Sequence, residues 1–133
     1  LSLLEEIPEE RLTYAYAEGK WTVAEALVHM FDTERIFQYR ALCIARNDKS
    51  EFPGFDQDAY VPVSNANKRS KRELIDEYVA VRDSSITLFA SLDEEALKRV
   101  GVASGSKISV RALGFITSGH QAHHIRILKE RYL

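Results

Sequence analysis

Three long segments of the sequence place apolar residues at steps of three and four, which is the period of one face of an α-helix. They run from Thr22 to about Asn47, from Ser70 to about Ser91, and from about Ser109 to Tyr132. The first two open with the Ser/Thr-x-x-Glu pattern of a capping box. Helices with such apolar seams pack nearly antiparallel against their neighbours. The sequence therefore predicts an all-α helical bundle, in a single domain over residues 1–133.

The connecting segments carry turn signals rather than further long helices. Asn47 to Arg69 contains Pro53-Gly54 and Pro62, so we expect a long irregular loop of the kind that often serves a site. A short helical turn is expected from Glu94 to Arg99. Gly101 to Lys107 is expected to be a turn or a small hairpin.

Three long helices are one too few for a four-helix bundle, in which the apolar face of each helix is covered by its neighbours. Leu1 to Ile7 has the character of the last two turns of a first helix, which ends before Pro8. We expect that most of this helix is missing from the chain, or that a second subunit covers the exposed seam of the helix beginning at Ser70. The second alternative predicts a homodimer. That seam consists of Leu74, Tyr78, Val81 and Leu88.

Composition excludes several classes of protein. With 45% apolar residues the chain can form a real core, and no apolar run has the length of a membrane span. The formal net charge of −2 disfavours nucleic acid as a partner, and the charged N-terminal residues do not resemble a signal peptide. The single cysteine, Cys43, excludes an internal disulfide and is expected in the core. We therefore expect a cytoplasmic domain that acts on a small molecule.

The four histidines are the residues most suggestive of chemistry. His29 lies in the first long segment, and the other three lie in the last. His120 and His124 are four residues apart, so both rings project from one helix face and can reach one ion. They fall within an apolar seam, where two buried imidazoles cannot both be protonated cheaply and a metal would satisfy both. The seam consists of Val110, Leu113, Thr117, His120, His124 and Ile127.

A second seam can be drawn through the same segment, and it pairs His120 with His123 instead. Periodicity thus fixes His120 and leaves its partner open. We favour His124, because a four-residue step is the commoner geometry for two ligands on one helix. His123 would then lie at the rim of the site. The alternative seam consists of Leu113, Ile116, His120, His123 and Ile127.

His29 supplies a third ligand from another helix, which leaves an open position of the kind found in catalytic sites. Imidazole ligands suit Zn, Ni, Fe or Cu. Asp32, one turn from His29, could accept the other ring N–H of a ligating histidine. Glu34 and Arg35 are expected to form a solvated or inter-helix pair. Gly119 is expected to permit close helix packing.

These motifs together resemble the DinB-like, or damage-inducible, family. The two most specific stretches are W-[ST]-x-x-E-x-x-x-H, which begins at Trp21, and G-H-x-x-H-H, which begins at Gly119. The resemblance implies an up-up-down-down four-helix bundle and a divalent metal on three histidines, which fall at His29, His120 and His124. It also implies that members are often homodimers, and that related branches include thiol S-transferases that use bacillithiol or mycothiol.

We therefore expect a metal-dependent enzyme in which a low-molecular-weight thiol attacks a small electrophile. Three neutral ligands leave the ion its full charge, which lowers the pKa of a bound thiol or water. A hydrolase that activates water, with Asp32 or His123 as base, is the alternative. A non-catalytic metal-binding protein of the stress response is the third possibility. The sequence names no further catalytic residue.

Overall fold

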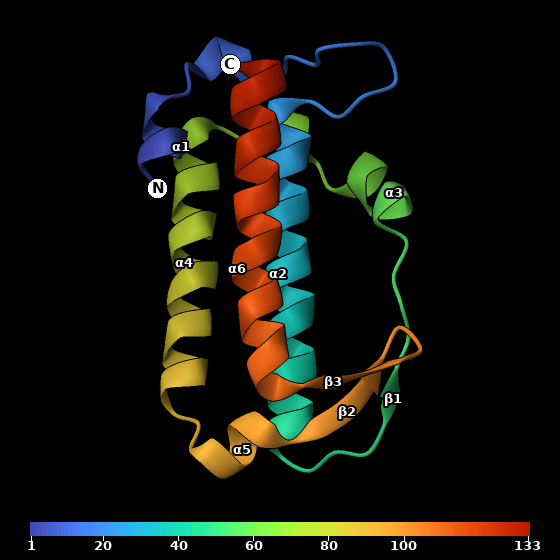
Figure 1. The fold of residues 1–133 in the computed structure, drawn as a ribbon. Coiled ribbons are helices and arrows are strands. Elements are labelled where there is room, and N and C mark those ends of the chain that lie inside the picture. The colour runs from blue at the N-terminus through green and yellow to red at the C-terminus, as the bar shows by residue number, and fades with distance from the viewer.

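Three long helices lying side by side form the body of the protein in a computed structural model that describes residues 1–133 (Figure 1). They are α2 (Val23–Ala45), α4 (Lys71–Ala90) and α6 (Val110–Ile127), and α2 packs against both of the others. A π-helical turn, η4 (Leu128–Tyr132), continues α6. The predicted helical segments are confirmed.

The predicted start signals are confirmed at atomic detail. At the start of α2 the hydroxyl of Thr22 accepts a hydrogen bond from the Glu25 amide, and the Glu25 carboxylate accepts one from the Thr22 amide. Ser70 and Glu73 form the same reciprocal pair at the start of α4. Each box satisfies amides that the first turn of a helix leaves without partners. Glu25 is thus a capping residue, as expected.

A small sheet departs from the strictly all-α expectation. It contains β1 (Glu51–Phe52), β2 (Val100–Ala103) and β3 (Ser106–Ser109), with β2 parallel to β1 and antiparallel to β3. The β2–β3 hairpin turns at Ser104 and Gly105, which both have positive φ, as a two-residue hairpin turn requires. The hairpin was one of two expectations for this segment, whereas the pairing with β1 was not expected.

The segment from Asn47 to Arg69 contains no long helix, as expected, but it is more ordered than an irregular loop. It includes the short helix α3 (Gln57–Tyr60), which Asp56 caps, and the 3-10 turns η2 (Val61–Val63) and η3 (Ala66–Lys68). Buried Val61 and Ala66 anchor it to the bundle. The short helix α5 (Glu94–Lys98) occupies the expected position before the hairpin.

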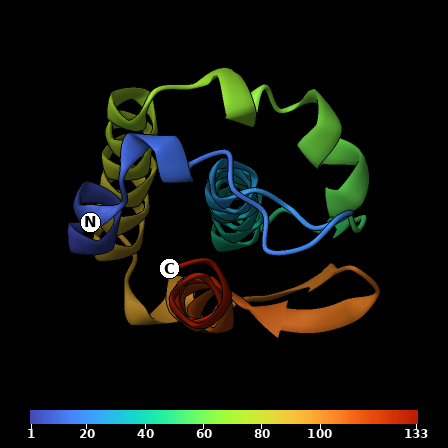
Figure 2. The same ribbon diagram turned by 90° about the horizontal axis from the view of Figure 1, so that it is seen from above.

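The N-terminal residues cover one end of the bundle, as seen from above in Figure 2. Helix α1 (Ser2–Glu6) packs against α4 and ends before Pro8, and the 3-10 turn η1 (Glu9–Arg11) follows. Apolar residues of this region are buried in the main core with α2, α4 and η4. No helix has both the length and the apolar character required to cross a membrane.

Two expectations about the core need correction. Of the α4 seam, Leu74 and Val81 are buried within this chain in the main core, whereas Tyr78 and Leu88 are only partly buried. The large apolar side chains that α4 exposes include Val79 and Ile86 instead. Cys43 is partly exposed rather than part of the core.

Candidate metal centre

Three histidines from two helices converge where α2 packs against α6. The Nε2 atom of His120 lies 3.2 Å from Nε2 of His29 and 3.1 Å from Nε2 of His124. One nitrogen from each of the three rings falls within 4.8 Å of the other two, and the cluster contains no carboxylate. The structure thus brings together the three residues that were predicted as ligands.

Helix packing explains why these rings meet. His29 lies on the buried face of α2 and is 3% exposed. On α6 the buried residues are Val110, Leu113 and Thr117, whereas Ile116 is exposed. The inward seam is therefore the one that continues through His120 and His124, which are partly buried.

The donor set of this cluster fits a metal ion. A ring nitrogen offers either one N–H or one lone pair, so Nε2 of His120 can form only one of its two short contacts as a hydrogen bond. With neutral rings at most one of these two contacts is a full hydrogen bond, whereas a cation between the rings would accept a lone pair from all three nitrogens. With metal–nitrogen bonds of about 2.1 Å, a tetrahedral site separates its ligand nitrogens by about 3.4 Å. The separations from His120 are close to that value.

Burial holds these rings in the neutral form that binds metals. Burial, together with the charge of His120, lowers the pKa of His29 to about 4. Burial and the neighbouring histidines likewise lower the pKa of His124 to about 4. The pKa of His120 is also lowered, chiefly by burial. Neutral imidazoles at pH 7 are competent ligands.

The contacts of His29 differ from the expected ones. The hydroxyl of Thr33, one turn along α2, lies 3.5 Å from Nδ1 of His29. No hydrogen bond joins Asp32 to a histidine; the charged groups that act on it are those of Glu77, Arg35 and Arg69. Burial and the charge of Glu77 raise the pKa of Asp32. Thr33 is the partner that sequence reasoning missed, although its four-residue spacing from His29 was a signal.

Two other residues of the histidine motif lie outside the cluster. His123 is exposed, and its Nδ1 atom lies 3.3 Å from the Arg126 guanidinium. A side chain at Gly119 would meet nothing within 4 Å, so the expectation that Gly119 permits close helix packing is wrong.

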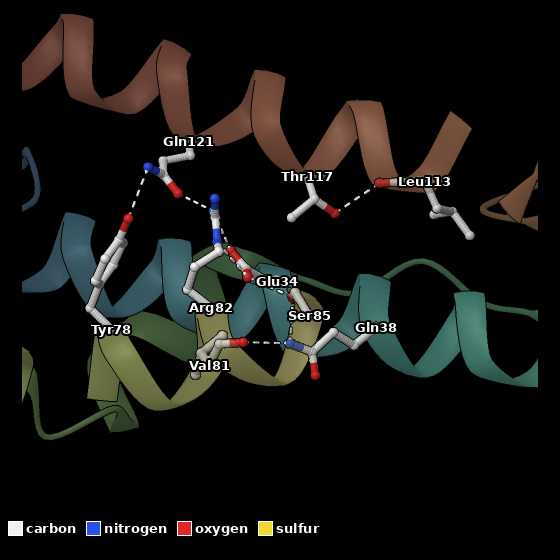
Figure 3. Close-up of polar contacts among 9 residues, drawn as sticks. All are labelled: Glu34, Gln38, Tyr78, Val81, Arg82, Ser85, Leu113, Thr117 and Gln121. Atoms are coloured by element: carbon white, nitrogen blue, oxygen red, sulfur yellow. Dashed lines mark hydrogen bonds and ion pairs between the residues drawn. The ribbon is translucent and has the colours of Figure 1, made fainter. Parts of the chain in front are cut away.

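A buried polar network adjoins the cluster and links all three long helices (Figure 3). Glu34 of α2 is 8% exposed and accepts hydrogen bonds of 3.0 and 2.8 Å from Arg82 of α4. Ser85 donates a further bond of 2.6 Å to the same carboxylate. Arg82 also contacts Gln121, the neighbour of His120 on α6. Glu34 is thus part of an inter-helix pair, but the pair is not solvated.

Arg35 does not take part in that pair. It contacts Glu77 of α4, which also forms an ion pair with Arg69. Glu34 and Arg35 were predicted to form one pair, but each has its own partner on α4: Arg82 for Glu34 and Glu77 for Arg35.

A helical bundle with three converging histidines defines a class of candidate metalloproteins. Residues 1–128 match the family model described as the DinB superfamily, and the chain belongs to this superfamily. A protein of Oceanobacillus iheyensis, provisionally named a metal-dependent hydrolase, is 26% identical over 125 residues, which cover 91% of this chain and 70% of the relative.

The fold also matches a solved structure. YfiT of Bacillus subtilis, provisionally described as a metal-dependent hydrolase with an unusual four-helix bundle topology, superposes with a TM-score of 0.76 at 15% identity. The match covers 96% of this chain and 77% of YfiT. At this identity the likeness establishes a shared fold.

Proposed function

We propose that the protein is a metal-dependent enzyme whose single divalent ion is held by His29, His120 and His124. The observation that carries this proposal is the convergence of three neutral imidazole nitrogens that cannot satisfy one another by hydrogen bonding. The name of the Oceanobacillus relative is consistent with a metal at this position.

A divalent ion with three neutral ligands retains its full positive charge and lowers the pKa of a thiol or water towards neutrality. The residues of the chain supply the remaining requirements. Thr33 lies against the second nitrogen of His29 and favours one ring orientation. The indole of Trp21 packs 4.7 Å from the His29 ring and shields that ligand from water.

Thiol S-transfer to a small electrophile is the reaction we favour. No carboxylate belongs to the histidine cluster, and the nearby carboxylate of Glu34 is committed to Arg82 and Ser85. A thiolate needs no general base once its proton has been lost, so this set of residues suits a thiol nucleophile. Hydrolysis by activated water is the second candidate, and the names of the two relatives support it.

Elemental analysis of protein purified without a metal-affinity tag tests the metal site. We expect one divalent ion per chain in the wild type and none in the His29→Ala variant. If both proteins contain the same substoichiometric metal, the histidines have a structural role and the proposal fails.

The reaction is tested with metal-loaded protein, a low-molecular-weight thiol and the electrophile monochlorobimane. Conjugation that requires metal and is lost in His29→Ala would support S-transfer. Turnover of esters or amides without thiol would establish the hydrolase instead. Failure of both assays over a broad substrate panel would favour a non-catalytic metal-binding protein.

A further inference from the structure

A cavity of about 280 Å³ lies beside the histidine cluster, and its lining comes mainly from the loop before α2 and the last turns of α6 with η4. Figure 1 shows that these segments meet at one end of the bundle. His124 is one of its lining residues, and so is Trp21, which packs against His29. The cavity therefore borders the histidine cluster through His124 and Trp21. Its lining combines aromatic rings with two cationic side chains, and the proposed reaction alone does not require this combination.

Three aromatic side chains, Tyr16, Trp21 and Tyr132, form one part of the cavity wall, and hydrogen bonds hold Tyr132 in place. The Tyr132 hydroxyl donates a bond of 2.7 Å to the carbonyl of Trp21. The ring of Tyr16 packs edge-on against Tyr132, with 5.0 Å between centroids. Tyr132 is anchored in turn through its own carbonyl, which accepts a bond of 2.8 Å from Arg11. This wall is a preorganised apolar surface beside the cluster.

Two cations lie on the same lining. Arg131 donates a hydrogen bond of 3.1 Å to the hydroxyl of Tyr16, which fixes the position of its guanidinium. Lys20 is the second cation, and Asp58 of α3 is the acidic residue of the lining, so one net positive charge remains. The π-helical turn η4 places Arg131 and Tyr132 together on this lining. Departures of this kind from α-helical geometry are frequent at functional sites.

We propose that this cavity binds a small molecule with an apolar or aromatic body and a carboxylate, and that Arg131 binds the carboxylate. The guanidinium of arginine matches the geometry of a carboxylate, and the aromatic wall accommodates the body of the ligand. That this ligand is the substrate of the enzyme rests on the proposed function. Binding of the ligand to the cavity can be measured without turnover.

The protein contains its own reporter for this test. Trp21 is the only tryptophan in the chain and lies in the cavity wall, so its fluorescence responds to a ligand bound there. Phenylacetate and phenylacetamide are suitable probes, because they share shape and ring and differ in charge. We expect phenylacetate to bind about tenfold more tightly to the wild type, since a charge-assisted hydrogen bond is stronger than a neutral one.

Variants assign the preference to individual residues. Arg131→Gln should remove most of the difference between the two probes, and Arg131→Lys should restore part of it. Asp58→Asn should tighten binding of phenylacetate and leave phenylacetamide unchanged. Arg126→Gln is the matched control, because Arg126 is on the same helix but contacts His123 outside the cavity. Circular dichroism checks that each variant is folded.

Removal of metal with a chelator separates this proposal from the proposed function. We expect the preference for phenylacetate to persist in metal-free protein, because the cations that cause it belong to the chain. A preference that vanishes with the metal and is insensitive to Arg131→Gln would show that the carboxylate binds the ion, and would overturn the inference. Equal binding of the two probes, or binding of neither, would also overturn it. If the preference persists but the protein shows neither stoichiometric metal nor thiol conjugation, only the proposed function fails.

Discussion

His120 occupies the middle of the histidine cluster, because its Nε2 atom contacts both of the other rings. Its place in the inward seam was predictable from spacing alone. Its partner was not, because His123 and His124 each complete a sequence of three- and four-residue steps. The exposure of Ile116 and the burial of Thr117 show which of the two seams faces α2.

The first prediction at this scale concerns the pair of histidines on α6. Replacement of His124 by alanine should abolish stoichiometric metal binding, because two imidazoles hold a divalent ion far less tightly than three. His123→Ala is the control and should retain the metal, because its ring lies outside the cluster. Elemental analysis of the two variants decides between them. The reverse result would show that the pair is His120 with His123.

The second prediction concerns Glu77, whose pKa reflects opposing causes. Burial raises this pKa, but hydrogen bonds and charge from Arg35 and Arg69 more than offset the effect and hold the pKa below its ordinary value. A carboxylate with a depressed folded-state pKa contributes stability that is fully present above the ordinary pKa of 4.5 and is lost as the pH falls from there through the lower folded-state pKa.

Glu77→Gln should therefore reduce the free energy of unfolding by about 1 kcal/mol at pH 7. The difference from wild type should shrink as the pH is lowered from 5 to 3, as measured by urea denaturation. Glu95→Gln, in an exposed ion pair with Arg99, should have little effect at any pH. A difference for Glu77→Gln that stays constant with pH would show that its charge is not responsible.

At the scale of elements, the helices were predictable, a hairpin was one of two expectations for Gly101 to Lys107, and the pairing of β1 with β2 was not predictable. The helices and their caps depend on residues within a few positions of one another, such as Thr22 and Glu25. The pairing of β1 with β2 joins residues far apart in sequence, Glu51 with Val102, and β1 has only two residues. No periodicity can appear in so short a strand. Likewise, nothing near Glu34 in the sequence identifies Arg82 as its partner.

The Glu34–Arg82 pair gives the third prediction, because it joins α2 to α4 beside the histidine cluster. Glu34→Gln should destabilise the protein by about 3 kcal/mol, since it leaves a partly buried guanidinium without its counter-charge. Urea denaturation at pH 7 measures this loss. Glu94→Gln breaks the exposed pair with Arg111 and should cost less than about 0.5 kcal/mol. Equal losses in the two variants would contradict a special role for the buried pair.

At the scale of the whole molecule, exposed apolar side chains suggest which face the predicted homodimer would use. Ile86 of α4 and Phe115 of α6 are 58% and 73% exposed, and they border a cavity of about 370 Å³ between the two helices. Exposed apolar patches of this kind are typical of protein–protein contacts. The predicted homodimer would therefore use this face, and not the seam of Leu74 and Val81.

The fourth prediction follows from this face. Light scattering at low micromolar concentration should report a dimer for the wild type and a monomer for Phe115→Glu, because a charge there cannot be buried without a partner. Val63→Glu replaces an apolar residue that is 84% exposed and lies in η2, outside α4 and α6, and it should leave the mass unchanged. A monomeric wild type would refute the prediction.

The two-residue strand β1 has a consequence for the order in which the protein opens and closes. Its pairing with β2 closes a long loop of chain that includes α3, α4 and α5. Contacts between residues far apart in sequence form late in folding. An element held by only a few such contacts opens at a lower free energy than the core helices do. In amide hydrogen exchange we therefore expect the amide of Ser104, which donates to the Phe52 carbonyl, to exchange long before those of the buried turns of α2. Strand β1 can then separate from β2 while the histidine-bearing helices stay folded, with Val61 and Ala66 still buried against the bundle.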